Sequence, residues 1–425
     1  MWSLKVFMEI RGEQRLVGYI NGDSYQDACF SYAQDYLDNE SGRPISISLP
    51  LTDVPFSPAK TKNFFEGLLP EGFSRKAVAT WIKADENDYL SILSVLGREC
   101  IGAIKIIEGE EDAEAAYTAL SMDRVRELAE EGATKSTEIL MKTHLSLAGA
   151  TGKVGLYYDD SENKWYLPQG DAPSTHIVKQ SHVRLDQIVL NERLCMQTAR
   201  LTGIEVPESF IINTGNGNDP EVLFATKRYD RLFSGNRFLG RLQIPERLHQ
   251  EDFSQAMGIP ANEKYEKTGG QYLRRMFELI RANAADPVAE QLKLWKMIVF
   301  HFLIGNTDAH IKNFSLLYSD DLKKISLAPA YDIVCTRVYN LTDEMSIALG
   351  GEIHLQRMNR STFASAAAEA GLSERMALKI FDETADIFED SLSEAADILE
   401  ESGFSQVRDL RERIIKNSGL SIRGM

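Results

Sequence analysis

The sequence predicts an α+β fold in which a strand-rich first part precedes an almost wholly helical second part. Three observations predict it. Short runs that alternate apolar and polar residues dominate up to about residue 247, one long helical pattern interrupts them at 185–201, and helical periodicity prevails after 248. At 425 residues the chain exceeds what one hydrophobic core usually supports, so we expect two or three domains.

Composition and charge narrow the class of protein. Hydrophobic residues make up 43% and charged residues 26%, which is ordinary for a folded globular chain. The formal net charge of −16 argues against binding nucleic acid by the net field of this chain, so we expect DNA contacts only through a partner. The sequence shows neither a signal peptide nor an apolar run of about 18 residues, which predicts a cytoplasmic protein without a membrane contact. Four scattered cysteines fit a reducing compartment.

Residues 1–107 are predicted to form a mixed α/β domain. Residues 4–10 and 15–20 alternate like two strands of a hairpin, and residues 45–51 alternate again. A helical pattern at 64–78 contains Pro70 and Gly72, which predicts two short helices. A strand at 102–107 is expected to close the domain.

The remaining chain is predicted as an acidic linker at 108–120, a strand-rich domain at 121–247 and a helical domain at 248–425. An amphipathic helix is expected at 121–131, and a helix with one apolar stripe at 381–399 is expected to pack on its own domain. The expected strands of the second domain are 138–142, 144–148, 153–158, 165–167, 176–179, 209–213 and 222–226.

The segment 301–315 carries the strongest chemical signal. Asp308 lies five residues before Asn313, and Asp332 follows 19 residues later in a predicted short apolar strand. Kinase-type phosphoryl transfer needs a carboxylate that accepts the proton of the substrate hydroxyl, and an amide oxygen plus a second carboxylate that hold magnesium. An ordinary loop with Asp and Asn as turn formers is the alternative.

A second signal is a glycine-containing turn between two predicted strands. It contains Ser146, Gly149, Ala150, Thr151, Gly152 and Lys153. Glycines allow backbone amides to approach phosphates closely, because no Cβ blocks the approach. The segment is not a P-loop, since Leu147 and Val154 stand where that motif needs Gly and Ser or Thr. A plain hairpin turn remains the alternative.

Two further pairs of residues fit a nucleotide site. Lys179 ends a predicted apolar strand, where a lysine is costly to bury unless it meets an anion, and Glu192 on the next helix is its expected partner. A surface lysine on an edge strand is the alternative. The strand 222–226 runs into Lys227 and Tyr229, where a hinge would present backbone groups and an aromatic wall to adenine.

These features follow one another in the order found in kinases, and eight patches of sequence resemble the HipA family, the kinase toxins of bacterial type II toxin–antitoxin modules. The patches are 43–51, 63–70, 96–103, 146–150, 175–179, 250–252, 264–266 and 307–315. They occur in collinear order, and the resemblance implies a two-lobed protein-kinase-like fold that uses ATP and Mg²⁺.

The resemblance also implies residue roles. Asp308 would be the catalytic base, with His310 and Lys312 supporting its loop. Asn313 and Asp332 would be the magnesium ligands. The ATP-binding residues would be Lys179, Gly149, Ala150, Thr151, Gly152, Lys153, Lys227, Tyr229 and Glu192. Ser146 falls on the regulatory serine that the family autophosphorylates. The chain has Thr151-Gly152 where the family usually has Gln-Glu, so Thr151 is a second candidate phosphoacceptor.

The resemblance implies two macromolecular partners. One is a HipB-like helix-turn-helix antitoxin that supplies the DNA contact, and the other is a protein substrate, an aminoacyl-tRNA synthetase of the glutamyl type. A small-molecule kinase of the aminoglycoside phosphotransferase type is one alternative, but such kinases lack the first 107 residues. An inactive kinase that serves as an antitoxin-binding co-repressor is the other. It is disfavoured because Lys179, Asp308, Asn313 and Asp332 are all present.

Overall fold

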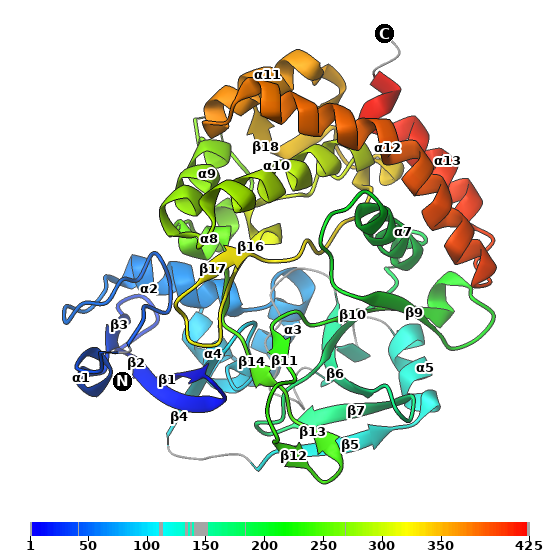
Figure 1. Ribbon diagram of the computed structural model, residues 1–425. Coiled ribbons are helices and arrows are strands. Elements are labelled where there is room, and N and C mark those ends of the chain that lie inside the picture. The colour runs from blue at the N-terminus through cyan, green and yellow to red at the C-terminus, as the bar shows by residue number, and fades with distance from the viewer. Residues whose placement is uncertain are drawn as a thin grey trace. The chain divides into compact units, whose positions relative to one another are not determined.

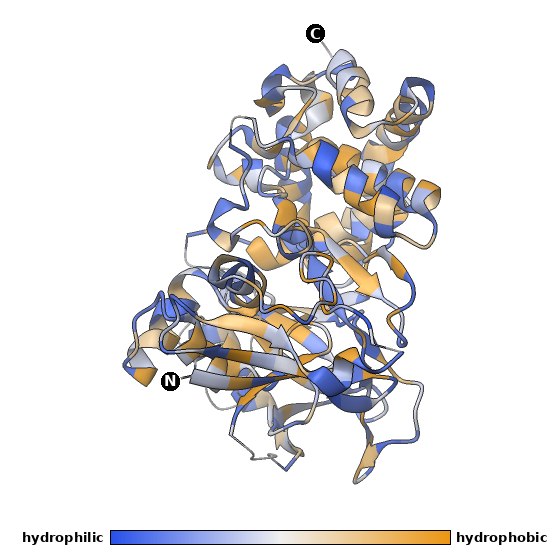
Figure 2. Cartoon of the chain, turned by 90° about the vertical axis from the view of Figure 1, so that its left-hand side faces the viewer, coloured by the Kyte–Doolittle hydropathy of each residue, from blue (hydrophilic) through white to orange (hydrophobic). Residues whose placement is uncertain are grey.

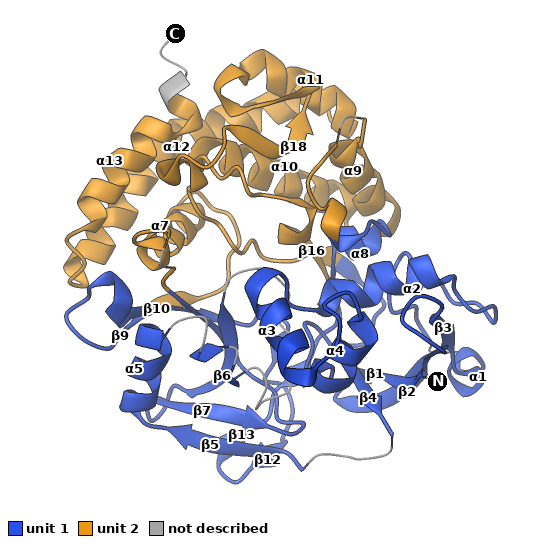
Figure 3. Ribbon diagram, turned by 180° about the vertical axis from the view of Figure 1, so that it is seen from behind, with its two compact units in different colours: residues 1–180, 212–261, 317–325 blue, residues 181–211, 262–316, 326–425 orange. Residues whose placement is uncertain are grey.

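The computed structural model describes residues 2–40, 42–109, 114–131, 135–136, 138–139, 152–182, 184–267 and 269–422. The chain forms two compact units, coloured separately in Figure 3. Unit 1 comprises residues 1–180, 212–261 and 317–325, and unit 2 comprises residues 181–211, 262–316 and 326–425. Each unit is assembled from three stretches of chain, so the contiguous domain boundaries stay a prediction.

The first sheet of unit 1 is antiparallel and has the strand order β3-β2-β1-β4 (Figure 1). Its strands are β1 (Trp2–Ile10), β2 (Glu13–Gly22), β3 (Cys29–Tyr32) and β4 (Ile104–Glu108). The predicted hairpin and the predicted closing strand are confirmed. The helices that follow β3 are α1 (Gln34–Leu37), α2 (Pro58–Phe65), α3 (Gly72–Ile82) and α4 (Tyr89–Leu96), with a 3₁₀ turn at Glu66–Leu68 between α2 and α3.

The second sheet of unit 1 has six strands in the order β5-β7-β6-β8-β10-β9. They are β5 (Ala116–Leu120), β6 (Lys153–Asp159), β7 (Lys164–Gln169), β8 (His176–Gln180), β9 (Ser209–Asn213) and β10 (Val222–Lys227), and helix α5 (Met122–Glu131) follows β5. Five of these strands and the helix were predicted and are confirmed. Shorter strands complete the unit: β11 (Arg231–Leu232), β12 (Phe238–Leu239), β13 (Leu242–Gln243), β14 (Glu246–Arg247) and β15 (Gln250–Asp252), followed by α8 (Phe253–Ala256).

The strand predicted at 45–51 is wrong, because only an isolated bridge joins Ser46 to Leu49. Side chains satisfy this backbone in place of a neighbouring strand. The Tyr32 hydroxyl accepts from Ile45 N at 3.0 Å and donates to Leu49 O at 2.5 Å. The Glu251 carboxylate accepts from the backbone N–H of the intervening Ile47 at 3.1 Å. Apolar alternation therefore occurs here without a strand ladder.

Two further predictions around the linker fail. Residues 116–120, assigned to the linker, form β5, because Tyr117 packs on Tyr157 with ring centroids 4.5 Å apart and its hydroxyl donates to Pro173 O at 2.8 Å. Glu138, assigned to a strand, is helical. Its carboxylate lies 3.3 Å from the amine of Lys135, three residues earlier, which is a helical spacing.

The strand predicted at 144–148 lies outside the described residues.

Unit 2 is mainly helical. Its helices are α7 (Ile188–Leu201), α9 (Tyr272–Asn283), α10 (Pro287–Ile304), α11 (Arg360–Ala370), α12 (Glu374–Glu401) and α13 (Val407–Asn417). Helix α12 packs against α7, α10, α11 and α13. Figure 2 shows hydrophilic and hydrophobic residues sharing single helices, as amphipathic helices require.

The core of unit 2 is aromatic. Phe363 lies at the centre, with ring centroids 6.0 Å from Trp295, 5.0 Å from Phe302 and 4.5 Å from Phe381. The stripe predicted on the last long helix is buried in α12, from Phe381 to Leu399. The prediction that this helix packs on its own domain is confirmed. No helix in the described part of the chain is both long and apolar enough to cross a bilayer.

The region after 248 also contains strands, so the prediction of an almost wholly helical region is partly wrong. Besides β15, they are β16 (Ser315–Tyr318), β17 (Ile325–Leu327), β18 (Glu344–Leu349) and β19 (Glu352–His354). Gly350 and Gly351 turn β18 into β19 with φ of 56° and 83°. Two consecutive residues with positive φ form the tight hairpin turn that favours glycine.

Candidate active site

The loop that carries Asp308 leaves the C-terminus of α10 in unit 2 (Figure 1). Gly305 ends the helix with φ of 72°, and Asn306 N donates to His301 O at 2.9 Å. A Cβ at position 305 would lie 2.8 Å from Asn417 O. Only glycine combines this left-handed backbone with so close a neighbour, so the helix end fixes the direction in which the loop starts.

Neutral side chains hold the loop backbone on both sides of Thr307. Its N–H donates to Thr336 Oγ1 at 2.8 Å, and its carbonyl accepts from Ser346 N at 3.1 Å and from Ser346 Oγ at 2.6 Å. The N–H of Asp308 donates to Asn306 Oδ1 at 3.1 Å. The backbone is therefore fixed, and the Asp308 residue is exposed to solvent.

Asp308 and Asn313 are brought together on one loop. The carbonyl of Asp308 accepts from His310 N at 2.8 Å and from Asn313 Nδ2 at 2.9 Å. Asn313 N in turn donates to His310 O at 2.8 Å. The amide nitrogen of Asn313 is thus used inside the loop, and its amide oxygen is the atom that could hold a metal ion. Amide and carboxylate oxygens are the hard ligands that Mg²⁺ prefers, so this donor set fits the metal.

Asp332 does not lie in a strand, which corrects the prediction. Its φ is 58°, in the left-handed region that interrupts an extended chain. The preceding Tyr331 fixes it, because the Tyr331 hydroxyl donates to Lys312 O at 2.9 Å and lies 2.6 Å from Ser315 Oγ. These two contacts flank Asn313, so the segments of both predicted magnesium ligands lie side by side. A non-glycine residue held in this conformation is a feature common at functional sites.

Two histidines support the loop from the interior. Burial lowers the pKa of His301 to about 4, against the opposing effect of the Asp332 carboxylate, so the ring is neutral at neutral pH. Its Nδ1 lies 3.1 Å from Asn306 Nδ2, an arrangement in which the ring nitrogen accepts. His310 is buried and packs edge-on against Tyr265, with ring centroids 5.2 Å apart. Lys312, like His310, is largely buried.

Tyr265 is a site residue that we did not predict. Its hydroxyl donates to Asp308 Oδ1 at 2.7 Å. The tyrosine lies in the patch 264–266 that carried part of the family resemblance, but no spacing rule connects it with a residue 43 positions later. His301 was likewise not assigned a role, because its neutral state follows from burial that the sequence does not show.

Unit 1 contains the predicted phosphate-binding lysines. Lys179 lies on β8 directly opposite Lys153 on β6 and Phe224 on β10. Its amine stands 5.7 Å from the centroid of the Phe224 ring. Directly opposed residues share a face of the sheet, and two like charges there repel. Contact of these two lysines with the phosphates of ATP stays a prediction.

The other predicted nucleotide residues are distributed over both units. Glu192 is buried on α7 in unit 2, whereas Lys179 belongs to unit 1, so their pairing stays a prediction. Gly152 immediately precedes β6. Ser146, Gly149, Ala150 and Thr151 lie outside the described residues.

Lys227 and Tyr229 occupy different surroundings in unit 1. Lys227 lines a groove of about 490 Å³ together with Tyr158 and His176. The hydroxyl of Tyr229 instead donates to Gln250. The chain stays in unit 1 up to residue 261, so the predicted hinge is not the place where it passes to unit 2. Contact of these two residues with a nucleotide stays a prediction.

Comparison with known proteins decides the family. The family model of the HipA N-terminal domain matches residues 8–107, and that of the HipA-like C-terminal domain matches residues 145–392. The chain belongs to the HipA family. It is 33% identical to the "Putative kinase Y4mE" of Sinorhizobium fredii over 90% of this chain and 91% of that protein. It is 26% identical to the "Serine/threonine-protein kinase toxin HipA" of Shewanella oneidensis over 79% of this chain and 77% of that one.

A solved structure of HipA from Shewanella oneidensis, in complex with HipB and operator DNA, is similar over 99% of both chains. The TM-score is 0.79 and the sequence identity 22%. The predicted α+β kinase-like fold is confirmed by this similarity. Two of these relatives are named as kinases, which supports kinase activity at the level of the HipA family.

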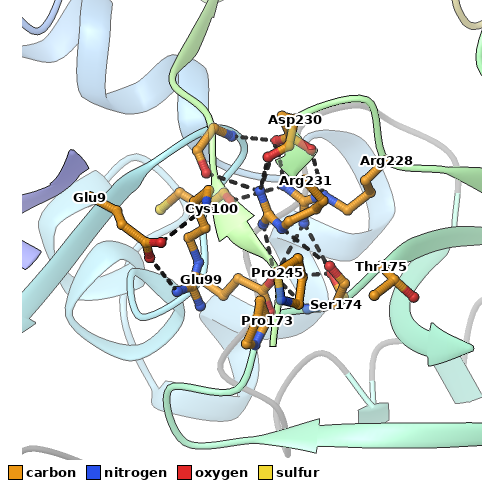
Figure 4. A network of polar contacts seen from close by, with 12 residues as sticks. Glu9, Glu99, Cys100, Pro173, Ser174, Thr175, Arg228, Asp230, Arg231 and Pro245 are labelled. Carbon is orange, nitrogen blue, oxygen red and sulfur yellow. Dashed lines mark hydrogen bonds and ion pairs between the residues drawn. The ribbon is translucent and has the colours of Figure 1, made fainter. Parts of the chain in front are cut away.

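The two HipA domain matches meet inside unit 1 in a buried ion network (Figure 4). Glu99, from the N-terminal match, lies 3.3 Å from Arg228 and 3.0 Å from Arg231. Asp230 completes the network at 2.7 Å from Arg228, and it also accepts from Gly102 N at 2.8 Å. Residues 228–231, which follow the predicted ATP-binding residue Lys227, are thus bound to the region that matches the HipA N-terminal domain.

Burial and ion pairing oppose each other in this network. Burial alone would raise the pKa of the Glu99 and Asp230 carboxyls, but the guanidinium groups of Arg228 and Arg231 hold both pKa values below the usual range. Burial and the neighbouring Arg228 lower the pKa of Arg231 to about 10, so it remains charged at neutral pH. All four groups are therefore ionised in the folded protein.

Proposed function

We propose that this protein is an ATP- and Mg²⁺-dependent serine/threonine protein kinase that acts as a growth-arresting toxin. The observation that supports it best is the loop in which Asn313 is hydrogen-bonded to the carbonyl of Asp308 at 2.9 Å while the Asp308 side chain is exposed. A base and a metal ligand held on one rigid loop are what phosphoryl transfer requires, since its catalysis is mostly positioning and electrostatic stabilisation.

In the proposed reaction, the hydroxyl oxygen of the acceptor bonds to the γ-phosphorus of ATP, the bond from that phosphorus to the β-γ bridging oxygen breaks, and ADP leaves. Asp308 accepts the hydroxyl proton. Lys179 and Lys153 would face the phosphates, and Gly149, Ala150, Thr151 and Gly152 would supply the phosphate-covering loop. Asn313 and Asp332 would hold Mg²⁺, which when bound neutralises charge on the phosphates.

The proposed partners follow the family. The related Shewanella oneidensis HipA is bound to HipB and operator DNA. We propose a HipB-like helix-turn-helix antitoxin for this chain, and the net charge of −16 suits a basic companion that supplies the DNA contact. The proposed substrate is an aminoacyl-tRNA synthetase, of the glutamyl type as in the family.

The proposed self-regulation involves Ser146. A phosphate there adds about −1.5 to −2 charges beside the phosphates of ATP, which would drive the glycine-containing loop out of the site. Intact-protein mass spectrometry after incubation with ATP tests this. The Ser146→Ala variant should lose most of its phosphate gain, whereas a full phosphate gain in that variant would move the site to Thr151 or elsewhere.

The deciding experiment replaces the base. Asp308→Asn keeps the size of the side chain but removes its basicity, and loss of a general base typically lowers rates by about 10²–10⁴. Transfer from γ-labelled ATP to the protein itself and to a purified synthetase measures the effect, and thermal unfolding checks the fold. Asp390→Asn, an exposed position on α12, is the matched control. Equal transfer rates in the parent and Asp308→Asn would reject the proposal.

A further inference from the structure

The hydrogen bond between Tyr265 and Asp308 has surroundings that distinguish it from a chance surface contact. Tyr265 is 47% exposed, and its hydroxyl donates to Asp308 Oδ1 at 2.7 Å. Its ring is nearly perpendicular to that of His310, two residues after the candidate base, with the centroids 5.2 Å apart. One side chain thus contacts the Asp308 loop at two points, through its ring and through its hydroxyl.

The residue after Tyr265 anchors this segment to unit 2. Glu266 N donates to Ser346 O at 2.9 Å. The Glu266 carboxylate accepts from Tyr272 N at 3.0 Å and from Ala348 N at 2.8 Å. The segment is therefore bound to the start of α9 and to strand β18, so the position of the tyrosine is set by backbone groups.

The same strand also fixes the loop of the candidate base. Ser346, which accepts from Glu266, donates through its N–H and its hydroxyl to the carbonyl of Thr307. Ser346 therefore binds the residue after Tyr265 and the residue before Asp308. The backbone at both ends of the tyrosine–aspartate hydrogen bond is fixed by the same residue of β18.

An exposed aspartate side chain ordinarily samples several rotamers. A base is effective only while its oxygen lies within hydrogen-bond reach of the proton that it accepts, and small displacements lower the rate strongly. A donor fixed by the backbone restricts the carboxylate to one orientation before the substrate arrives. Positioning of this kind by a supporting residue acts on the chemical step and leaves nucleotide binding alone.

We propose that Tyr265 is a positioning residue, which holds the carboxylate of Asp308 in the orientation that accepts the proton of the substrate hydroxyl. This inference rests on the proposed kinase function. It assigns a role to a residue 43 positions before the loop, on a segment that precedes α9. The tyrosine hydroxyl transfers no proton in the proposed reaction.

The test compares two tyrosines of the same segment. Tyr265→Phe removes the hydroxyl that contacts Asp308. Tyr272→Phe removes a hydroxyl that donates to Glu263 O at 2.7 Å and keeps the N–H that binds Glu266, so it disturbs the segment without touching Asp308. The initial rate of transfer from γ-labelled ATP to myelin basic protein, measured over a range of ATP concentrations, separates kcat from the KM for ATP.

We expect Tyr265→Phe to lower kcat by about tenfold, with the KM for ATP unchanged and with Tyr272→Phe within about twofold of the parent. Equal losses in the two variants would overturn the inference, because they would show a loosened segment. A rise in the KM for ATP without a loss of kcat would also overturn it.

Failure of this inference is distinguishable from failure of the proposed function. If the parent transfers phosphate and the kcat of Tyr265→Phe is within about twofold of the parental value, only the role of Tyr265 is overturned. If the parent transfers no phosphate from ATP to myelin basic protein, to itself or to a synthetase, the proposed function is overturned, and the role of Tyr265 with it.

Discussion

The buried ion network of unit 1 and the loop around Thr307 in unit 2 are held by different kinds of polar contact. Unit 1 buries full charges, since Glu99, Asp230, Arg228 and Arg231 are each at most 6% exposed. In unit 2 the described contacts around Thr307 are neutral hydrogen bonds from Thr336, Ser346 and Asn306. The two aspartates of the candidate site in unit 2 are more accessible, since Asp308 is exposed and Asp332 partly exposed.

This difference follows from what each interior does. The network of unit 1 joins distant stretches of chain, for example Glu99 to Arg231, 132 residues apart. Charged hydrogen bonds are strong and directional, although desolvation offsets much of their benefit. At Thr307, directly before Asp308, a further charge would act on the nearby carboxylates and on any metal ion that they hold. Neutral donors and acceptors fix that backbone without such an effect.

The largest effect is expected where a charge of unit 1 loses its partner. Glu99→Ala leaves the buried guanidinium groups of Arg228 and Arg231 short of one carboxylate. Breaking a buried ion pair from one side typically costs about 3–5 kcal/mol. Urea unfolding measures the free energy of unfolding. Glu383→Ala is the control, because the pair of Glu383 with Lys379 is exposed and should contribute at most about 1 kcal/mol.

A loss in Glu99→Ala no larger than that in Glu383→Ala would mean that the network contributes little to stability. The network also sets an acid limit. The pKa values of Glu99 and Asp230 are lowered by folding, so their contribution is present above the unfolded values near about pH 4 and is lost as the pH falls below that.

Glu251 in unit 1 should show the opposite dependence on pH. Burial raises the pKa of its carboxyl to about 7, although hydrogen bonds from Ser46, Tyr318 and Ile47 act in the other direction. A carboxyl whose pKa is raised by folding contributes stability that is full below its unfolded pKa and is lost as the pH rises through the folded value. The parent should therefore lose about 3 kcal/mol from this group between about pH 4 and pH 8.

Glu251→Gln removes the titration and should abolish this part of the slope. As the pH rises, the parent should lose stability that the variant keeps, so the free energy of unfolding of the variant should increase relative to that of the parent. Urea unfolding at about pH 5 and about pH 8 measures it. The exposed Glu389→Gln on α12 should keep the parental slope. Parallel pH profiles for the parent and Glu251→Gln would show that Glu251 stays ionised throughout.

Local patterns in the sequence predicted those elements in which residues of one kind recur at the spacing of a helix or a strand. The apolar stripe of α12, from Phe381 to Leu399, specified both a helix and its buried face. The spacing of Asp308 and Asn313 likewise marked one loop, in which a hydrogen bond joins residues five positions apart. The Gly350-Gly351 pair was a readable hairpin signal that we did not use.

Contacts between distant residues could not be predicted in this way. Asn191 on α7 holds Cys335 through two hydrogen bonds of 3.0 Å across 144 residues, and no local pattern marks either residue. The alternation at 45–51 predicted a strand because it could not show that Tyr32 and Glu251 satisfy that backbone. Tyr265 escaped prediction for the same reason, since its partner is set by the position of β18.

The smallest expected effect concerns the neutral network of unit 2. Thr336 Oγ1 accepts from Thr307 N at 2.8 Å, and Thr336→Val keeps the shape of the side chain but leaves that N–H without its acceptor. An unsatisfied polar group of this kind costs about 1–3 kcal/mol, and the lower end applies because Thr336 is partly exposed. Thr384→Val is the control, because the Thr384 hydroxyl only donates to a carbonyl of its own helix, at 2.7 Å.

If neutral hydrogen bonds position the loop, Thr336→Val should lower the rate of phosphate transfer by more than its small loss of stability suggests, because Asp308 follows the displaced Thr307 directly. Glu99→Ala should behave in the reverse way, with a large loss of stability and a transfer rate per folded molecule close to that of the parent. Measuring both quantities for both variants tests the comparison itself. Rates that simply follow stability in all variants would show that neither interior is specialised.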